Sequence, residues 1–526
     1  MTDEATKHPR RKGFVHQSAV SSGAALLAML AGLLIDVALA LRFGAGRESD
    51  AFFVAARIPI GTTALLMTVA TQSLVPTFTR VRAHGGQEAL GPFASKVLTA
   101  VLLGGFALWA VASLLAGPLV AVTAPGLSAH EQHVAQGMVP LMFLVVPLVA
   151  AAETVRAALN ASFSFVLPAG MNLFMNGPTA SIILVSAGAD IRVVAWAYVA
   201  GATCQLAVVL GAAWRRHIRI SLSPRLRDPL LGQALRLSGR PTVSSLLNLG
   251  NRVAEQLLAS FLPTGSITIL SYGQRLISAL GGGVFFRPVT VALMPRLAEA
   301  EHRERPDQVV DLLARGLRFV FAISMVLTAF TVALAEPVVK VVFHRGNFTP
   351  QATHLLGLSL AVYGASLVGS GVQRVLLAPF YARMDARVPL RNTFYGVLVD
   401  LALLGPCIAL YGGDSTRGVL GVALAFSVTQ YLIVAHAWYR LRRTVPLRLA
   451  ALLPSVLRTT AVAVVAAAGM SVFVRAADLS SVTERTRLVI LTVAAGSIGA
   501  IIVGVLGVLL AGRGWRMKLH DELSAG

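Results

Sequence analysis

The sequence predicts an all-α polytopic membrane protein with about fourteen transmembrane helices. Of the 526 residues, 56% are hydrophobic and only 13% are charged, which is too apolar for a soluble domain. Apolar runs long enough to cross a bilayer recur along the chain, and Lys and Arg collect in alternate gaps between them. This composition excludes a soluble enzyme, a secreted disulfide scaffold and a disordered chain.

The expected spans follow one another from the N-terminal end, separated by turn-forming residues such as Pro125–Gly126 and Gly412–Gly413. They lie near residues 18–42, 50–79, 95–122, 133–160, 164–187, 191–214, 234–262, 265–296, 315–337, 351–381, 388–411, 417–440, 455–475 and 486–511. The first run is too long for the apolar region of a signal peptide, so we interpret it as a span.

The distribution of charge predicts the orientation. The formal net charge is +21, but most of the basic residues lie in gaps such as 215–233. The opposite gaps 123–132 and 263–266 contain no Lys or Arg. Because cytoplasmic loops collect basic residues, both termini are expected in the cytoplasm. The basic excess therefore indicates contact with anionic membrane lipids, and nucleic acid is not an expected partner.

Spans 1 and 2 resemble spans 7 and 8, which indicates an internal repeat. Asp36 precedes Arg57 by 21 residues, and Arg57 precedes Pro76 by 19. Glu255 precedes Arg275 by 20 residues, and Arg275 precedes Pro295 by 20. The two copies lie an even number of spans apart, so they share one orientation. This predicts two six-helix lobes in a parallel pseudo-repeat, an arrangement that transporters use for alternating access.

The domain prediction follows from the spans and the repeat. It assigns residues 1–17 to a cytoplasmic tail, 18–214 to an N-terminal lobe (spans 1–6), 215–233 to a basic cytoplasmic linker, 234–440 to a C-terminal lobe (spans 7–12), 441–511 to the last two spans and 512–526 to a cytoplasmic tail. The linker is either a solvated basic segment or a short segment at the membrane interface.

Charged residues inside spans are costly and should face a cavity or a partner. Arg57, Arg275 and Arg287 lie on the second helix of each lobe. The planar fork of Arg suits phosphate, so these residues are candidates for a pyrophosphate-bearing lipid. The alternative is that each Arg extends to a membrane surface or pairs with an acid.

Two pairs of oppositely charged residues lie three positions apart: Glu153 with Arg156, and Arg252 with Glu255. Each pair either contributes to a ligand site or neutralises its own charges. Asp400 is a lone acid in an apolar run. With Glu255 and the hydroxyls of Ser427 or Thr429 it is a candidate oxygen-ligand site for a coupling cation.

The sequence contains no nucleophile motif, no paired catalytic carboxylates and no phosphate-binding loop, so we expect a transporter without a chemical catalytic site. The two cysteines, Cys204 and Cys407, and His436 show no metal-ligand spacing. We expect no cofactor, and no metal beyond a sodium ion.

Several motifs resemble the MurJ/MviN family, the lipid II flippases of the MOP exporter superfamily. They include FGAGRESDAFFVAARIP (43–59), RAALNASFSFVLPAGMN (156–172), ASFLPTGSITILSYGQRL (259–276), VVFHRGNFT (341–349) and FYARMDARVP (380–389). The resemblance implies fourteen helices, a lipid-tail groove along the last two, and a bacterial cytoplasmic membrane location. It also implies export of a polyprenyl-pyrophosphate-linked peptidoglycan precursor, driven by Na⁺, H⁺ or membrane potential and in contact with cell-wall synthesis proteins.

The resemblance assigns the family's substrate-site charges to Asp36, Asp50, Arg57 and Arg275, with Arg287 and Arg252 as additions of this chain. It assigns the sodium site to Glu255 and Asp400, although a further acid expected four residues later is Leu404 here.

This chain departs from the family where span 1 carries arginines, because Met29 and Ile35 occupy those places. The arginine-bearing stretch of span 2 reads IGTTALLMTVAT, and an acid after the span 8 Arg is Ser278. The alternatives are therefore a flippase for another lipid-linked glycan, a non-transporting scaffold of cell-wall synthesis, and a MATE-like ion-coupled exporter of small molecules.

Overall fold

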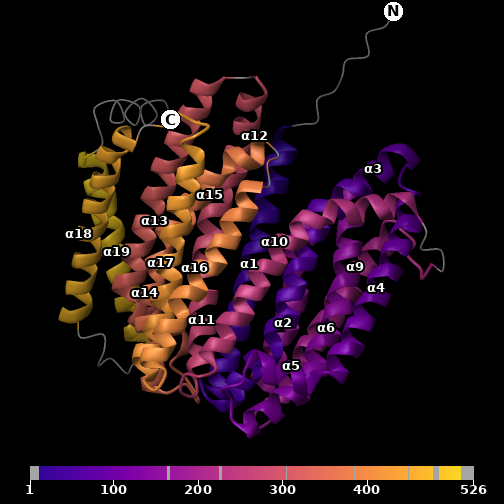
Figure 1. The fold of residues 1–526 in the computed structure, drawn as a ribbon, viewed down its shortest axis with the longest axis horizontal. Coiled ribbons are helices and arrows are strands. Elements are labelled where there is room, and N and C mark those ends of the chain that lie inside the picture. The colour runs from indigo at the N-terminus through magenta and orange to yellow at the C-terminus, as the bar shows by residue number, and fades with distance from the viewer. Residues whose placement is uncertain are drawn as a thin grey trace, which may run out of the picture. The chain divides into compact units, whose positions relative to one another are not determined.

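The structure, a computed structural model, describes residues 11–162, 166–223, 228–303, 305–383, 385, 387–447, 449–477 and 485–510. Every regular element in these residues is a helix (Figure 1), which confirms the all-α class. Contacts divide the chain into two units. The first comprises Met1–Phe43 and Arg47–Leu257, and the second comprises Gly44–Gly46 and Leu258–Gly526.

The helices up to residue 259 belong mainly to the first unit. They are α1 (Arg11–Phe43), α2 (Arg47–Val69), the π-helical η1 (Ala70–Leu74), α3 (Val75–Gly85), α4 (Leu90–Leu114), α5 (Ala116–Thr123), α6 (Ala129–Ala161), α7 (Val166–Gly170), α8 (Asn172–Val185), α9 (Arg192–Arg215) and α10 (Pro229–Ala259).

The second unit contains the remaining helices. They are α11 (Ser266–Ser278), the π-helical η2 (Ala279–Phe285), α12 (Phe286–His302), α13 (Pro306–Phe343), α14 (Pro350–Gly364), α15 (Ser366–Ala382), α16 (Arg387–Tyr411), α17 (Ser415–Leu441), the 3₁₀ turn η3 (Leu449–Ala451), α18 (Leu453–Ala476) and α19 (Arg485–Leu510).

Among the described residues, eleven helical stretches are long and apolar enough to cross a membrane. The predicted spans 164–187, 234–262 and 265–296 fall on other helices. The first coincides with α7 and the 14-residue α8, the second with the polar α10, and the third with α11 and α12, which η2 separates. The count of fourteen therefore stays a prediction, as do the boundaries of the two lobes.

Helix α6 forms the centre of the first unit and packs against α2, α4 and α9. Its second half buries a run of alanines that includes Ala150–Ala152, Ala157 and Ala158. Small side chains let helix backbones approach closely, which is a principal source of packing energy inside a membrane. This close packing brings α2 and α6 together where polar side chains meet.

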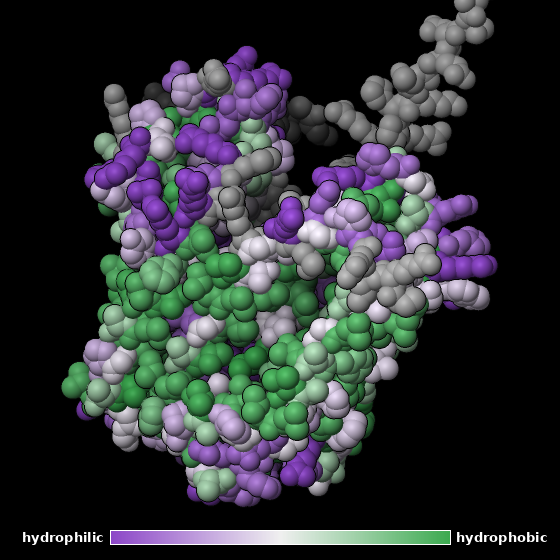
Figure 2. All heavy atoms as spheres, turned by 45° about the vertical axis from the view of Figure 1, so that its right-hand side comes forward, coloured by the Kyte–Doolittle hydropathy of each residue, from purple (hydrophilic) through white to green (hydrophobic). Residues whose placement is uncertain are grey.

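In the second unit, α13 packs against α14, α15 and α18, and α17 packs against α14, α15 and α16. Large apolar side chains remain exposed on the outer helices, for example Val464 and Val472 of α18, with 59% and 66% of their surface accessible. On the face drawn in Figure 2, hydrophobic side chains cover the middle of each unit and hydrophilic ones gather at its ends. Exposed apolar surface of this kind is typical of contact with lipid.

The two π-helical segments of the described residues lie in the helices that the sequence repeat pairs with each other. η1 follows α2 and precedes Pro76 by two residues, whereas η2 follows α11 and precedes Pro295 by ten. A proline lacks the N–H that would bond to the residue four positions earlier, so Pro76 interrupts the bonding within η1, whereas Pro295 is too distant to account for η2. The shared irregularity supports the predicted repeat, although its register differs between the copies.

The segment 218–223 between α9 and α10 lies extended along α4. The backbone N–H groups of Ser221 and Ser223 donate to the hydroxyls of Ser95 and Thr99 at 3.0 and 2.8 Å. Ile218 is buried, with 2% of its surface exposed. This part of the predicted linker is therefore hydrogen-bonded to α4.

Candidate functional site

Arg57 lies on α2 and bonds to the polar helix α10. Its Nε donates a hydrogen bond of 2.9 Å to Oε1 of Gln256. Gln256 and Glu255 are 1% and 6% exposed, and Nδ2 of Asn251 donates to Oε1 of Glu255 at 3.0 Å. A membrane helix this polar must face protein or a water-filled cavity. Arg57 is therefore bonded to a buried amide within the first unit, which argues against its extension to a membrane surface.

The other first-unit candidates differ in exposure. Arg252 is exposed, and Glu255, three residues later, accepts a hydrogen bond from Asn251. Asp36 and Asp50 are 5% and 2% exposed. Asp50 lies in the first turn of α2, where a carboxylate is stabilised by the partial positive charge of a helix N-terminus.

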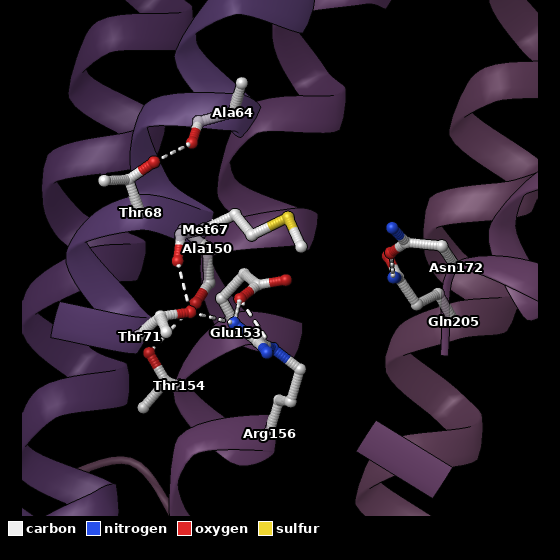
Figure 3. Close-up of polar contacts among 10 residues, drawn as sticks. All are labelled: Ala64, Met67, Thr68, Thr71, Ala150, Glu153, Thr154, Arg156, Asn172 and Gln205. Carbon is white, nitrogen blue, oxygen red and sulfur yellow. Dashed lines mark hydrogen bonds and ion pairs between the residues drawn. The ribbon is translucent and has the colours of Figure 1, made fainter. Parts of the chain in front are cut away.

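Glu153 and Arg156 form a buried ion pair on α6 (Figure 3). Arg156 donates from Nε and Nη2 to Oε2 of Glu153 at 2.8 and 2.5 Å. Its Nη2 also donates to Oγ1 of Thr71 in η1 at 3.1 Å. The two charges neutralise each other inside the first unit, so the interpretation as an ion pair holds for these residues. Their contact with η1 joins the π-helical segment to α6.

A second polar contact in Figure 3 joins α8 to α9. Nε2 of Gln205 donates to Oδ1 of Asn172 at 3.1 Å, and Gln205 is 1% exposed. Neither residue was a sequence-based candidate, because a single amide in an apolar run gives no spacing signal.

Asp400 of α16 meets α17 in the second unit. The hydroxyl of Thr429 donates to Oδ1 of Asp400 at 3.3 Å, and the two residues are 4% and 1% exposed. Ser427, two residues before Thr429, instead donates to the carbonyl oxygens of Val362 and Ala423. Of the two hydroxyls considered, Thr429 is therefore the one beside Asp400. Glu255 belongs to the other unit.

The polar track along α16 and α17 continues beyond Asp400. A ring nitrogen of His436 lies 2.8 Å from Oδ1 of Asn392, which is fully buried. The centroids of the His436 and Tyr395 rings are 4.7 Å apart. Sequence reasoning missed Asn392 and Tyr395. Asn392 and Asp400 are eight residues apart, so they share one helix face, and that spacing could have revealed them.

The remaining arginines lie around η2. Arg275 is half-buried in the last turn of α11, four residues before η2 begins. The backbone of Arg287 lies in the first turn of α12, but its side chain is outside the described residues. A π-bulge beside a membrane-embedded Arg is typical of a functional site.

An apolar cavity of about 500 Å³ lies between α13, α15, α17 and the start of α18. Its wall includes Phe321, Leu376, Trp438 and Val456, and Arg318 lies at its edge. Such a cavity suits an acyl or prenyl chain, which gains about 0.8 kcal/mol for each buried CH₂ group. Among the described residues, the wall of this cavity includes the start of α18 but no residue of α19, so the predicted lipid-tail groove along the last two helices stays a prediction.

Comparisons with known proteins agree with this geometry. A family profile described as "Lipid II flippase MurJ" matches residues 39–490. "Probable lipid II flippase MurJ" of Rhizobium meliloti (strain 1021) is 27% identical over 447 residues, covering 81% of this chain and 82% of the relative.

Solved structures show the same fold. "Lipid II flippase MurJ, inward closed conformation" superposes with a TM-score of 0.76 at 18% identity, covering 93% of this chain and 98% of the other. An inward-facing MATE family multidrug transporter of the MOP superfamily gives a TM-score of 0.65 at 15% identity, covering 82% and 99%. The profile match spans most of the sequence, and with it the motifs that carry the resemblance. The chain therefore belongs to the MurJ family of lipid II flippases.

Proposed function

We propose that this protein is a flippase that moves a polyprenyl-pyrophosphate-linked peptidoglycan precursor from the inner to the outer leaflet of the bacterial cytoplasmic membrane. The family match over residues 39–490 carries the proposal. Arg57, bonded to Gln256, supplies a cationic group within the first unit, and Arg275 supplies a second one beside η2. The apolar cavity of about 500 Å³ suits a lipid chain.

The proposed reaction is translocation by alternating access, with no bond made or broken. Arginine side chains would hold the pyrophosphate while its polar headgroup crosses the membrane. In the proposed orientation both termini lie in the cytoplasm, as the basic loops predict.

A coupling cation would bind at Asp400. The carboxylate and the Thr429 hydroxyl, 3.3 Å apart, offer two of the hard oxygen ligands that Na⁺ requires. A proton on Asp400 would serve the same role in H⁺ coupling.

The test is transport by the purified full chain in proteoliposomes containing fluorescent lipid II. The wild type should move the lipid between leaflets, and Arg275→Ala should slow transport at least ~10-fold through the lost phosphate contacts. Arg303→Ala is the matched control, because that side chain is 57% exposed and paired with Glu299. Wild-type protein that is folded and inserted yet moves no lipid II would overturn the proposal.

A different polyprenyl-linked glycan is the second candidate substrate. Met29 and Ile35 stand where the family carries arginines, and Ile35 is only 3% exposed. A site with fewer cationic donors favours a less anionic headgroup. Transport of such a lipid, with none of lipid II, would select this candidate.

A further inference from the structure

A second, smaller pocket lies far along α13 from the apolar cavity. It has a volume of about 220 Å³ and is enclosed by α13, α14 and α18. Lys340 and Arg475 reach it from the last turns of α13 and α18, respectively. The wall away from these two cations is apolar and includes Val332, which is 49% exposed, Ala333 and Leu358. The pocket therefore combines a cationic rim with an apolar interior.

The position along α13 places this pocket at a membrane boundary. Arg318, at the edge of the apolar cavity, and Lys340 are 22 residues apart in one helix. At 1.5 Å per residue they are separated by about 33 Å, close to the hydrocarbon thickness of a bilayer. Lys340 and Arg475 thus lie at the level of lipid headgroups. In the proposed orientation this is the outer leaflet.

The charges at the rim are suited to an anion. Among the described residues that line the pocket, Glu336 is the one carboxylate beside Lys340 and Arg475, and its Oε1 lies 3.4 Å from Nδ1 of His354. An Arg donates two parallel hydrogen bonds to a phosphate, and a Lys adds a point charge. Each cation also stabilises the C-terminus of its own helix. Stabilising a helix C-terminus does not explain why the cations of two different helices line the same pocket.

The apolar wall is suited to a lipid chain. From Lys340 back to Val332 the pocket follows about 12 Å of helix toward the membrane interior. Gly357 of α14 brings that helix close to α13, since a Cβ there would lie 3.1 Å from the Cα of Glu336. The neighbouring face of α18 exposes Val472, so bilayer lipids have lateral access.

We propose that this pocket binds an anionic phospholipid, with Lys340 and Arg475 holding the phosphate and Val332 and Ala333 covering the first part of one acyl chain. The bilayer supplies such lipids continuously at this boundary, which favours a phospholipid over a rarer polyprenyl phosphate. The site is independent of the translocated substrate and does not rest on the proposed flippase function.

The test is native mass spectrometry of the full chain with added phosphatidylglycerol, and separately with phosphatidylcholine or a polyprenyl phosphate. The wild type should retain phosphatidylglycerol preferentially. The double variant Lys340→Gln/Arg475→Gln should bind it at least ~10-fold more weakly. The double variant Arg303→Gln/Arg315→Gln is the control, since it removes the same charge from side chains that are 57% and 73% exposed.

Two further variants separate a pocket from a charged surface. Ser471→Leu fills the pocket while keeping both cations, and it should also lose the phospholipid. Glu336→Gln removes the carboxylate and should bind phosphatidylglycerol at least as well as the wild type. Equal binding by the wild type and the Lys340→Gln/Arg475→Gln variant, loss of binding in Glu336→Gln alone, or binding of polyprenyl phosphate only, would each overturn the proposal.

Discussion

Helices α6 and α16 each bury a carboxylate in the membrane-spanning part of the chain, and their neighbours differ. Glu153 accepts two hydrogen bonds from Arg156 on its own helix. Asp400 accepts a hydrogen bond from the neutral hydroxyl of Thr429 on the next helix. The first carboxylate is neutralised locally by a full positive charge, whereas the second has a hydrogen-bond donor that carries none.

This difference separates two uses of a buried acid. The ion pair on α6 neutralises both of its charges, and Arg156 also bonds to Thr71 of η1, so removing Arg156 leaves a charge that water cannot reach. An acid beside a hydroxyl keeps oxygen ligands that a cation can use. We therefore expect substitutions in the α6 pair to affect folding and substitutions at Asp400 to affect ion coupling.

The largest expected effect is on stability, in Arg156→Met. The change leaves the Glu153 carboxylate buried with its ion-pair partner removed, which costs about 3–5 kcal/mol. Unfolding of the purified protein in detergent should show the loss. The double variant Glu153→Gln/Arg156→Met removes both charges and should recover most of it. If the double variant is as unstable as the single one, the charge of Glu153 is not the cause.

The next effect concerns ion coupling, in Asp400→Asn. Asparagine keeps the shape and the oxygen that accepts from Thr429, so the protein should fold normally. The lost charge should weaken cation stimulation of transport at least ~10-fold, about 1.4 kcal/mol. Transport measured against Na⁺ concentration and pH checks this.

Ser427→Ala is the control for Asp400→Asn, because the Ser427 hydroxyl bonds to backbone carbonyls. Unchanged cation dependence in Asp400→Asn would remove Asp400 from the coupling site.

Much of the fold could be predicted from the sequence, because apolar length and composition decide which helices cross a membrane. Eleven stretches follow those rules. The predicted spans that do not follow them fall on α7 and α8, on α10, and on α11 and α12, where a short helix, polar residues or a π-helical segment interrupts the pattern. One of these helices, α10, carries Gln256, which accepts a hydrogen bond from Arg57. Rules based on hydropathy are least accurate where a helix faces protein or a cavity.

The candidate site was predictable only in part. Charged residues in apolar runs are conspicuous, so Glu153, Arg156 and Asp400 could be named from the sequence. Thr71, which contacts Arg156, and Asn392, which contacts His436, could not be named, because they are common residue types whose meaning depends on which helix lies opposite. The choice between Ser427 and Thr429 likewise depends on helix rotation, which only the packing of α14, α16 and α17 determines.

A smaller effect is expected for Thr71→Val, which keeps the side chain's shape. It removes the oxygen that accepts from Arg156 and the hydroxyl that donates to the carbonyl of Met67. The loss should be about 1 kcal/mol in the free energy of unfolding. Thr68→Val is the matched control, since that hydroxyl donates only within its own helix, to Ala64 (Figure 3). Equal losses in both variants would show that the contact with Arg156 adds nothing.

The smallest expected effect lies outside the membrane-spanning segments, at Asp228 before α10. Nζ of Lys96 lies 2.7 Å from its Oδ2, and this hydrogen bond holds the pKa of Asp228 below its usual range. The resulting stability is present above the usual pKa of an Asp and is lost as the pH falls through the lowered pKa of the folded state. Because the pair is partly exposed to solvent, its contribution is at most about 1 kcal/mol.

Asp228→Asn should remove that acid dependence from the free energy of unfolding measured against pH. Asp190→Asn, at a side chain that is 62% exposed, should not. An unaltered pH profile in Asp228→Asn would mean that the ion pair does not stabilise the junction between the extended segment 218–223 and α10.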